Sequence, residues 1–396
     1  MNEREKKAVE YLRNECADLL TPKYNTNFNL LRWAIGYDFD LNESLFHLRR
    51  HLKLRLFHFL DDAPSNAGHS ILDKYFPIGI IGETIKDNNT LLVAECAGRI
   101  DLKGILKSVQ LSDFLFQRYC FQERVIERLN EMEKRTGKQA SVVYILDLDG
   151  LKLDSWLLSV VTGPYRILWA SVYTNYPEWI STMLVVNCPP FMGLVWKAIY
   201  PLLPERTRGK MRICSNTADA KAAARSLVSS SRLPLQWGGE LSSPAADAVS
   251  AHHDSIPISL YWKPSHTAPA ITDLISLVIP PGKNVYATYT VQYDKPFFFV
   301  INRFCDRTFG MSLFHHLDED PSKDTDEMRD WAPFFEYPGM PTVDRLIEKA
   351  PGPGTFKVHF SNEQAWIRSL EIRYRVLFED EGGNEIPFTT HKTVFV

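Results

Sequence analysis

The chain lacks the sequence signatures of the common nucleotide-dependent and hydrolytic enzymes. Its 396 residues contain no GxGxxG after an expected strand, no GxxxxGK[ST], no GxSxG and no HExxH. These motifs place backbone amides on phosphates, a nucleophile on a strand–helix turn, or a metal on one face of a helix. Their absence argues against a dinucleotide-dependent enzyme, a P-loop NTPase and an α/β-hydrolase.

Clustered cysteines, surplus positive charge and long apolar runs are also missing. The six cysteines include no CxxC pair, so we expect reduced core residues in a cytosolic protein. The formal net charge of −3 gives no support for a nucleic-acid partner. No run is long and apolar enough for a membrane span, and the charged start MNEREKKAVE lacks the apolar core of a secretory signal. We therefore expect a cytoplasmic protein whose contact with any membrane is peripheral.

The composition that is present suits two or three globular domains. Hydrophobic residues make up 45% of the chain and charged residues 23%, as in ordinary folded domains. Changes in pattern predict a helical N-terminal region, an α/β section, a small polar linker and an all-β section. These regions are residues 1–75, 76–240, 241–257 and 258–396.

Leucines at helical spacing run through the N-terminal region. Asn27 is expected to cap a helix that carries Leu30, Leu31 and Trp33. A second helix is expected after Asp40. His47 and His51 lie four residues apart on it and could share a metal ion, but no third ligand is evident nearby, so a solvated or capping role is favoured.

Strand and helix patterns alternate in the α/β section. Short apolar runs predict buried strands, and the longer stretches between them carry apolar residues at helical spacing. This alternation predicts a largely parallel sheet covered by helices. The expected strands are residues 90–97, 141–149, 182–187 and 210–214, and the expected helices are residues 112–135 and 154–175.

The hydrophobic period changes to two after the linker. Apolar and polar residues alternate over residues 285–293, 356–360 and 370–378, with Pro/Gly-rich turns at 280–282 and 351–354. Alternation of this kind, with such turns between runs, predicts an antiparallel β-sandwich.

One run in the α/β section is apolar almost all the way round a helix. It lies between Phe191 and Leu203, and Gly193 and Lys197 are its main interruptions. A helix without a polar face is either buried in a core or faces another apolar body, and this one is too short to span a bilayer. The residues expected to line an apolar cavity there are Phe191, Met192, Leu194, Val195, Trp196, Ile199, Tyr200 and Leu203.

Polar residues flank this run on both sides. Glu178 precedes it, and residues 204–210 supply the hydroxyl of Thr207 and three cations, among them Lys210. Thr207 and Lys210 share a face if that stretch is helical. An apolar helix edged by a carboxylate, a hydroxyl and cations suits an amphiphile, with acyl chains inside and a phosphate head group at the rim. The alternative is a core helix followed by a solvated basic turn.

The best enzymatic candidate is Asp147-Leu148-Asp149-Gly150, at the end of an expected buried strand. Two carboxylates at such an edge could hold Mg²⁺ for phosphoryl transfer. The phosphatase pattern requires Thr or Val two residues after the second Asp, where this chain has Leu151. A capped strand end is therefore favoured.

Residues 28–240 resemble a CRAL-TRIO lipid-binding module of the phosphatidylinositol-transfer type. Leu30-Leu31-Arg32-Trp33 with Phe39-Asp40 resembles the family's helical opening. The run Asn175–Glu178 followed by Val185–Pro189 resembles its NYPE…VVNAP signature, and Leu233–Gly239 resembles its closing LPxxFGG. Residues 258–396 resemble a GOLD domain, the sandwich that follows CRAL-TRIO in proteins of the supernatant-protein-factor and tocopherol-associated type.

This resemblance implies a fold and a ligand site. The helix matching Pro190–Leu203 would be the gate over a lipid cavity, and Glu178, Thr207 and Lys210 would hold the head group. The family's RxRK stretch is replaced by Ile35-Gly36-Tyr37-Asp38, and only Asp87 of its DGRPV turn is retained. Asp87 is counted with the head-group residues, and α-tocopherol, squalene or another lipid stays open beside phosphatidylinositol.

The resemblance thus implies a non-enzymatic protein, without metal or cofactor, that binds one lipid and exchanges or presents it at a transient membrane surface. We expect this surface to belong to the Golgi or another endomembrane. The alternative is a lipid-responsive adaptor in trafficking or signalling whose GOLD-like domain binds a protein partner. A metal-dependent α/β enzyme built on Asp147 ranks last.

Overall fold

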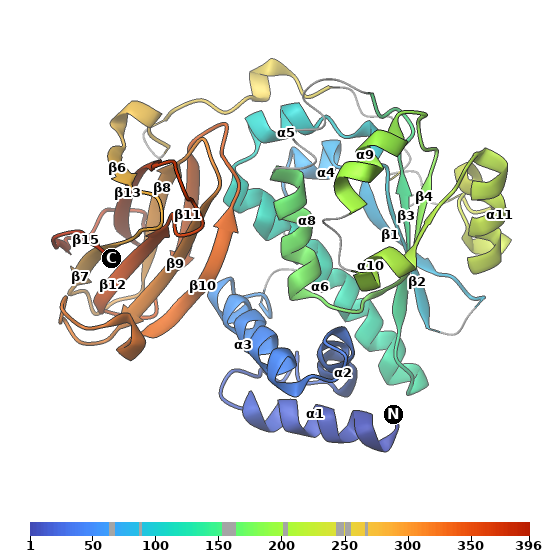
Figure 1. The fold of residues 1–396 in the computed structure, drawn as a ribbon, viewed down its shortest axis with the longest axis horizontal. Coiled ribbons are helices and arrows are strands. Elements are labelled where there is room, and N and C mark those ends of the chain that lie inside the picture. Colours follow the sequence, from blue (N-terminus) through green and yellow to red (C-terminus); the bar gives the residue numbers. More distant parts are fainter. Residues whose placement is uncertain are drawn as a thin grey trace. The chain divides into compact units, whose positions relative to one another are not determined.

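The computed structural model describes residues 1–62, 68–86, 89–152, 164–200, 205–242, 249, 255–265 and 268–396. Its backbone divides into two compact units. The first comprises residues 1–48, 64–105 and 117–257, and the second comprises residues 49–63, 106–116 and 258–396. Figure 1 gives the order of the elements along the chain.

Three helices open the chain: α1 (Glu3–Glu15), α2 (Asn27–Gly36) and α3 (Leu41–Phe57). Asn2 and Glu5 form a reciprocal capping box at the start of α1. Thr26 caps α2, because its hydroxyl accepts from the backbone N–H of Asn29 at 3.1 Å. The predicted cap, Asn27, is instead the first helical residue, and its side chain accepts from Arg13 at 2.7 Å.

The first unit is built on a five-stranded sheet in consecutive order: β1 (Ile78–Glu83), β2 (Thr90–Glu95), β3 (Ser141–Asp147), β4 (Ile180–Val186) and β5 (Met211–Ile213). Strands β2 to β5 are parallel, and β1 pairs antiparallel with β2. The predicted parallel strands are confirmed. The sequence analysis missed β1, whose glycines and uniformly half-buried side chains give no alternation.

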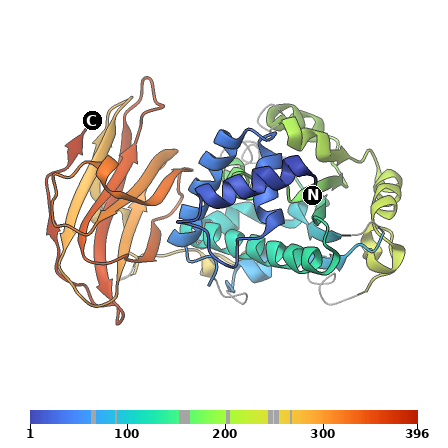
Figure 2. The ribbon, with the colours of Figure 1, turned by 90° about the horizontal axis from the view of Figure 1, so that it is seen from below.

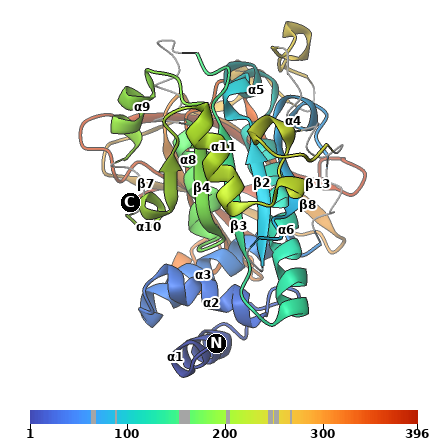
Figure 3. The ribbon, with the colours of Figure 1, turned by 90° about the vertical axis from the view of Figure 1, so that its right-hand side faces the viewer.

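Helices cover both faces of this sheet. They are α4 (Leu72–Tyr75), α5 (Leu102–Ser108), α6 (Leu111–Thr136), α8 (Pro164–Asn175), α9 (Met192–Ile199), α10 (Glu205–Lys210) and α11 (Thr217–Leu227). Right-handed crossovers between consecutive parallel strands place α6 and α8 on one face, and α11 lies on the other (Figures 1 and 3). Small side chains of α11 let it approach the sheet closely: Ala220, Ala223 and Ala224. The first part of the helix expected over 154–175 lies outside the described residues.

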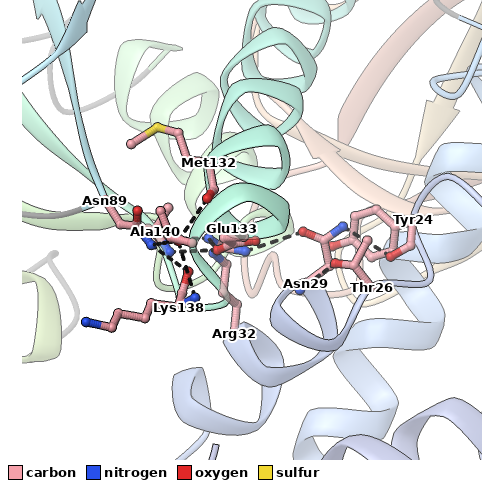
Figure 4. A network of polar contacts seen from close by, with 10 residues as sticks. Tyr24, Thr26, Asn29, Arg32, Asn89, Met132, Glu133, Lys138 and Ala140 are labelled. Atoms are coloured by element: carbon pink, nitrogen blue, oxygen red, sulfur yellow. Dashed lines mark hydrogen bonds and ion pairs between the residues drawn. The ribbon is translucent and has the colours of Figure 1, made fainter.

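A buried ion pair joins α2 to α6 (Figure 4). Arg32 donates to a carboxylate oxygen of Glu133 and, at 2.7 Å, to the carbonyl of Ala140. The same Glu133 oxygen accepts from the backbone N–H of Ala140 at 2.8 Å. Both side chains are almost fully buried, and burial raises the pKa of Glu133 against the opposing effect of Arg32. The pair fixes the N-terminal helices to the α/β core.

All six cysteines are free thiols, and five of them are buried, as expected from their apolar surroundings. Burial raises the pKa of Cys120 and of Cys305 to about 11. These thiols therefore stay protonated at neutral pH.

The second unit contains a sandwich of two antiparallel sheets (Figure 2). One sheet has the order β10 (Arg329–Tyr337), β9 (Phe309–His316), β12 (Gly354–Ser361) and β7 (Asn284–Val291), with β14 (Thr389–Thr390) and β15 (Val394–Phe395) on β7. The other has the order β11 (Asp344–Lys349), β8 (Phe297–Phe304), β13 (Leu370–Asp380) and β6 (Ile275–Ile279). Phenylalanine rings pack between the sheets: Phe297, Phe299, Phe356 and Phe378. The predicted sandwich is confirmed.

Residues 49–62, which include the second half of α3, pack on two edge strands of this sandwich. Lys53 pairs with Asp330 of β10 at 2.8 Å, and His58 contacts Glu348 of β11 at 2.6 Å. The ring of Phe57 meets that of Trp331 edge-on, with centroids 5.2 Å apart. Open strand edges invite pairing with other chains, and these contacts cover one edge of each sheet.

A second helical stretch, residues 106–116, reaches a buried ion pair in the sandwich. Asp344 accepts from the backbone N–H and hydroxyl of Ser112 at 2.7 and 2.8 Å. Its carboxylate also accepts from Nε and Nη2 of Arg303 at 3.0 and 2.9 Å. The start of α6 is thus tied to the sandwich by charge-assisted hydrogen bonds, which are the stronger kind.

A histidine on β12 predicts how the stability of the sandwich depends on pH. His359 bonds to Ser312 at 2.9 Å and to Asn284 at 3.1 Å, and it stacks on Tyr286 with centroids 4.8 Å apart. Burial lowers the pKa of His359 from 6.5 to about 4. The folded state therefore holds the neutral ring over a range in which the unfolded chain takes up a proton.

We expect the sandwich to lose stability as the pH falls from about 6.5 to about 4. In this window the unfolded chain binds more protons than the folded one, so acid favours unfolding. Thermal unfolding of the wild type and of His359→Gln across this range checks the effect. The variant should show a shallower decline, although His315, whose pKa burial also lowers, keeps part of the slope. Parallel curves for the two proteins would contradict the role of His359.

Candidate functional site

An ion pair lies where two parallel strands of the first unit begin. Nζ of Lys210 donates to Oε2 of Glu178 at 2.8 Å, and the two side chains are 20% and 16% exposed. Lys210 ends α10 directly before β5, and Glu178 lies two residues before β4. In the parallel pairing of these strands, Met211 at the start of β5 lies opposite Met183 of β4, so Lys210 approaches the first half of β4. The structure thus brings together two of the four residues that we assigned to a head group.

The other two of these residues are described in part or not at all. Thr207 lies in α10, three residues before Lys210, as the expected shared helical face requires. Its side chain lies outside the described part of the chain, and so does Asp87.

The turn that carries Glu178 is fixed from two sides. Glu178 follows Pro177 and has a φ of +55°, which is costly for a residue with a Cβ and needs support from its surroundings. The hydroxyl of Tyr176 donates to Glu123 of α6 at 2.6 Å. A Cβ on Gly36, the last residue of α2, would lie 2.8 Å from Cβ of Pro177 and 3.8 Å from Cγ of Glu178.

The same contact assigns a role to one position of the N-terminal stretch. Ile35-Gly36-Tyr37-Asp38 replaces the family's RxRK, and Gly36 stands at the position that is not basic in that pattern. Pro177 already occupies the space of a side chain at position 36, so this glycine supports the Glu178 turn through close packing.

Replacing Gly36 by alanine is expected to lower the free energy of unfolding by about 1–3 kcal/mol, the usual cost of overpacking. The added methyl group would push the turn at Pro177 away from α2. Chemical denaturation measures the effect. Gly209→Ala is the matched control, because a Cβ at this helical glycine meets nothing within 4 Å. The control should be neutral or stabilising, and equal losses in both variants would contradict the close-packing argument.

The apolar run forms helix α9, as expected for its centre. Phe191, Met192 and Trp196 are half-buried, and Tyr200 follows the last helical residue and is exposed. The side chains of Leu194, Val195 and Ile199, and all of Leu203, lie outside the described residues.

Helices α9 and α10 meet through an interaction that the sequence analysis did not find. The guanidinium of Arg208 lies over the ring of Tyr200 at 4.6 Å, and the Trp196 and Tyr200 rings are 5.4 Å apart. Arg208 lies two residues before Lys210 in the α10 segment. The same short helix therefore touches the end of the apolar run and also supplies the cation of the ion pair.

The carboxylate of Asp147 is used by the fold. Oδ1 accepts from the Asn187 side chain at 2.8 Å and from the Asp149 backbone at 2.9 Å. Oδ2 accepts from the indole N–H of Trp237 at 2.8 Å. Asp149 pairs with Arg99 at 3.1 Å. These contacts cap the end of β3 and attach the segment Leu233–Gly239 to it through Trp237. They agree with the interpretation of Asp147 as part of a capped strand end.

His47, one of the two α3 histidines that could share a metal ion, contacts an aromatic ring and a carboxylate. The ring of His47 stacks on Tyr37 with centroids 4.4 Å apart and lies 3.6 Å from Glu43. Across the described ranges, no cluster of three or more His, Cys, Asp or Glu side chains could hold a metal ion. Among the described helices, none has the length and hydrophobicity needed to cross a bilayer.

Two family models match the chain. Residues 74–239 match the CRAL/TRIO domain, and residues 260–387 match a model described as "F28H7_8_C: -like, C-terminal domain". The crystal structure of Sfh5 covers 56% of this chain and 83% of that chain, with a TM-score of 0.45 at 18% identity.

Several relatives match the chain in sequence. The CRAL-TRIO domain-containing protein F28H7.8 of Caenorhabditis elegans is 32% identical over 385 residues, which cover 96% of this chain and 91% of that protein. Protein ctg-1 of the same organism is 20% identical over 359 residues, 89% of this chain and 91% of that protein. Protein real-time of Aedes aegypti is 30% identical over 191 residues, 48% of this chain and 29% of that protein. The chain belongs to the CRAL-TRIO family, whose domain binds and transfers lipids and other small hydrophobic molecules and is generally not an enzyme.

Proposed function

We propose that the chain binds one amphiphilic lipid, phosphatidylinositol-like in its head group, and exchanges it with membranes. The observation that carries this proposal is the Lys210–Glu178 pair, whose cation belongs to the short helix α10 that also contacts Tyr200 directly after the apolar helix α9. Lys210 would bind the phosphate, Thr207 would donate a hydrogen bond to it, and Glu178 would accept from an inositol hydroxyl. Acyl chains would lie against α9, with Phe191, Met192 and Trp196 among the contacts.

The charge balance of the pair favours a head group that offers both an anion and hydroxyls. A phosphate alone would compete with Glu178 for the Lys210 ammonium, and the two anions would repel each other. A phosphate with neighbouring hydroxyls satisfies both members, because the cation holds the phosphate while the carboxylate accepts from a hydroxyl. A neutral lipid such as α-tocopherol or squalene would leave the pair intact and use only the apolar contacts.

Energetics restrict exchange to a membrane surface. Burying a methylene contributes about 0.8 kcal/mol. The free energy of two buried acyl chains, with roughly thirty methylenes in total, is therefore about 20–25 kcal/mol lower than that of the same chains in water. Free diffusion of the lipid through water is therefore negligible. An apolar cavity and a bilayer offer similar surroundings, so transfer between them is nearly neutral once α9 swings aside.

Transfer between vesicles tests the proposal. Fluorescent phosphatidylinositol in donor vesicles should reach acceptor vesicles at a rate proportional to protein concentration. Loaded protein held apart from vesicles by a dialysis membrane should release almost no label. Absence of protein-dependent transfer, for phosphatidylinositol and for α-tocopherol alike, would refute the proposal.

A second role, as a lipid-responsive adaptor, is favoured by the separate sandwich unit. This unit has its own aromatic core and is distinct from the unit that carries the lipid-binding residues. We propose that it acts as a GOLD-like domain, with the protein located in the cytoplasm at an endomembrane. Capture of the same cell-extract protein by lipid-loaded but not by lipid-free full-length chain would support an adaptor, and identical capture by both forms would contradict it.

A further inference from the structure

The two most exposed large apolar side chains of the described part of the chain are adjacent. Trp366 is 93% exposed and Ile367 is 88% exposed. They lie in the loop between β12 and β13 of the sandwich, which we call the Trp366 finger and define as residues 363–368. Single exposed apolar residues are ordinary on protein surfaces, but two bulky neighbours at this exposure indicate a surface that meets something apolar.

The base of the finger is fixed by a buried asparagine. Nδ2 of Asn362 lies 3.1, 3.2 and 3.0 Å from the carbonyls of Ile279, Pro280 and Arg368. Its backbone N–H donates to Lys283 at 3.0 Å, and its carbonyl accepts from Gly282 at 3.1 Å. These hydrogen bonds hold the finger against the turn of residues 280–283. The apolar tip, Trp366 and Ile367, is therefore carried by a loop with a fixed base.

Further apolar residues adjoin this base. Val396 exchanges two backbone hydrogen bonds with Asn284, at 2.9 and 3.0 Å, next to the 280–283 turn. The side chains of Val278 on edge strand β6 and of Phe395 and Val396 are each more than half exposed. Exposed apolar side chains are therefore also found on the segments that adjoin the base of the finger.

Two cations lie at the base of the finger, and one acidic residue belongs to the finger itself. Lys283 and Arg368 are exposed at its base, and within the described ranges neither has an ion-pair partner. Burial raises the pKa of Tyr286 on β7 and lowers that of His359 on β12, and the charge of Glu363, the acidic residue of the finger, acts to raise both. Glu363 therefore lies toward the sheet that contains these two strands. In an anionic membrane, a layer of phosphates covers the apolar acyl-chain region. An apolar tip with two cations behind it complements both layers, because the tip can enter the acyl-chain region while the cations contact the phosphates.

Two properties favour a bilayer over a protein partner. Tryptophan prefers the interface between head groups and acyl chains, because its ring is apolar and its indole N–H stays near water. A stable protein interface needs about 800 Å² from each partner, which is more than a narrow loop can supply. Insertion into a bilayer buries the apolar side chains at the tip of such a loop without requiring a wide, flat surface.

We propose that the Trp366 finger and the 280–283 turn form a membrane-contact surface of the sandwich unit. Trp366 and Ile367 insert at head-group depth, and Lys283 and Arg368 bind the phosphates of anionic lipids. This surface is separate from the lipid-binding residues of the first unit, and the inference does not depend on the proposed lipid transfer.

Vesicle co-sedimentation of the full chain tests the proposal. The probes are phosphatidylcholine vesicles with and without phosphatidylserine, at roughly 3:1 in the mixed vesicles. The wild type should bind the mixed vesicles, and the double variant Trp366→Ser/Ile367→Ser should bind them at least about tenfold more weakly, since it loses most of the inserted apolar area. A second double variant, Lys283→Gln/Arg368→Gln, should lose the preference for phosphatidylserine.

Leu317→Ser is the matched control. Leu317 is 70% exposed and directly follows β9, at the Thr355 end of β12, whereas the finger follows the opposite end of β12 at Ser361. This variant should bind vesicles like the wild type. Wild-type binding by the finger variant, or no vesicle binding by the wild type, would overturn the proposal. A chain that binds vesicles through the finger but carries no lipid would support this inference and contradict the proposed transfer.

Discussion

Replacing Arg32 by methionine is expected to lower the free energy of unfolding by about 3–5 kcal/mol, the usual cost of breaking a buried ion pair from one side. Methionine keeps much of the apolar stem but leaves the carboxylate of Glu133 buried without its cation. It also removes the hydrogen bond to the carbonyl of Ala140. Denaturant unfolding followed by far-UV circular dichroism measures the loss.

The pH dependence of this loss identifies its cause. Burial already raises the pKa of Glu133, and Arg32 opposes that rise. Without Arg32 the folded-state pKa rises further above the unfolded value, so folded Arg32→Met protein gains stability as acid protonates Glu133. The deficit should therefore shrink between neutral pH and about pH 4–5. Adding Glu133→Gln, which keeps an acceptor for the Ala140 N–H, should restore part of the stability at neutral pH. A deficit below about 1 kcal/mol, or one independent of pH, would contradict the account.

Replacing Lys210 by alanine is expected to weaken phosphatidylinositol loading by about 10- to 100-fold, the range for losing a charge-assisted hydrogen bond. The variant loses the cation for the phosphate, and the remaining Glu178 carboxylate then repels the head group. Loading of a neutral lipid such as α-tocopherol should stay unchanged. Equilibrium loading from vesicles, read by mass spectrometry of the bound lipid, measures both effects.

Lys197→Ala is the matched control for charge. Lys197 is an exposed cation on α9, and its loss should leave both lipids bound as in the wild type. The double variant Lys210→Ala/Glu178→Gln should recover part of the phosphatidylinositol loading, because it also removes the unpaired anion. Equal loading of both lipids by Lys210→Ala would refute the head-group assignment.

The sequence predicted the secondary structure of this chain best where the hydrophobic period is clear. The strands expected at residues 90–97 and 141–149 contain the apolar runs Leu91–Ala94 and Val142–Leu146, and the structure places both in the parallel sheet. The alternation over 370–378 likewise predicts β13. β1 escaped prediction because its burial follows from pairing with β2, which its own residue pattern does not encode.

Residues of the candidate site could be predicted only where their chemical type stands out from the neighbouring sequence. Glu178 and Lys210 stand out as charges beside an apolar run, and the structure pairs them. Arg208 is one of three neighbouring cations, and nothing in its spacing distinguishes the one that lies over Tyr200. Gly36 was noted only as part of a stretch that lacks the family's cations, because the approach of Pro177 is a long-range contact.

Packing between distant segments was the least predictable feature. Ser112 lies in an amphipathic stretch that resembles any helix start, and no pattern marks it as a partner of Asp344, more than 200 residues later. The exposure of Trp366 is hidden in the same way, because an aromatic residue between two strands is expected in a core as readily as on a surface.

The central claim is that the first unit holds a single amphiphile. Its most direct test is mild, non-denaturing mass spectrometry of the purified full-length chain, followed by solvent extraction and identification of what is released. The account predicts one lipid per chain, with an inositol phospholipid preferred when several lipids are offered and that preference lost in Lys210→Ala. A chain that purifies empty and takes up no lipid from vesicles of any composition would contradict the account.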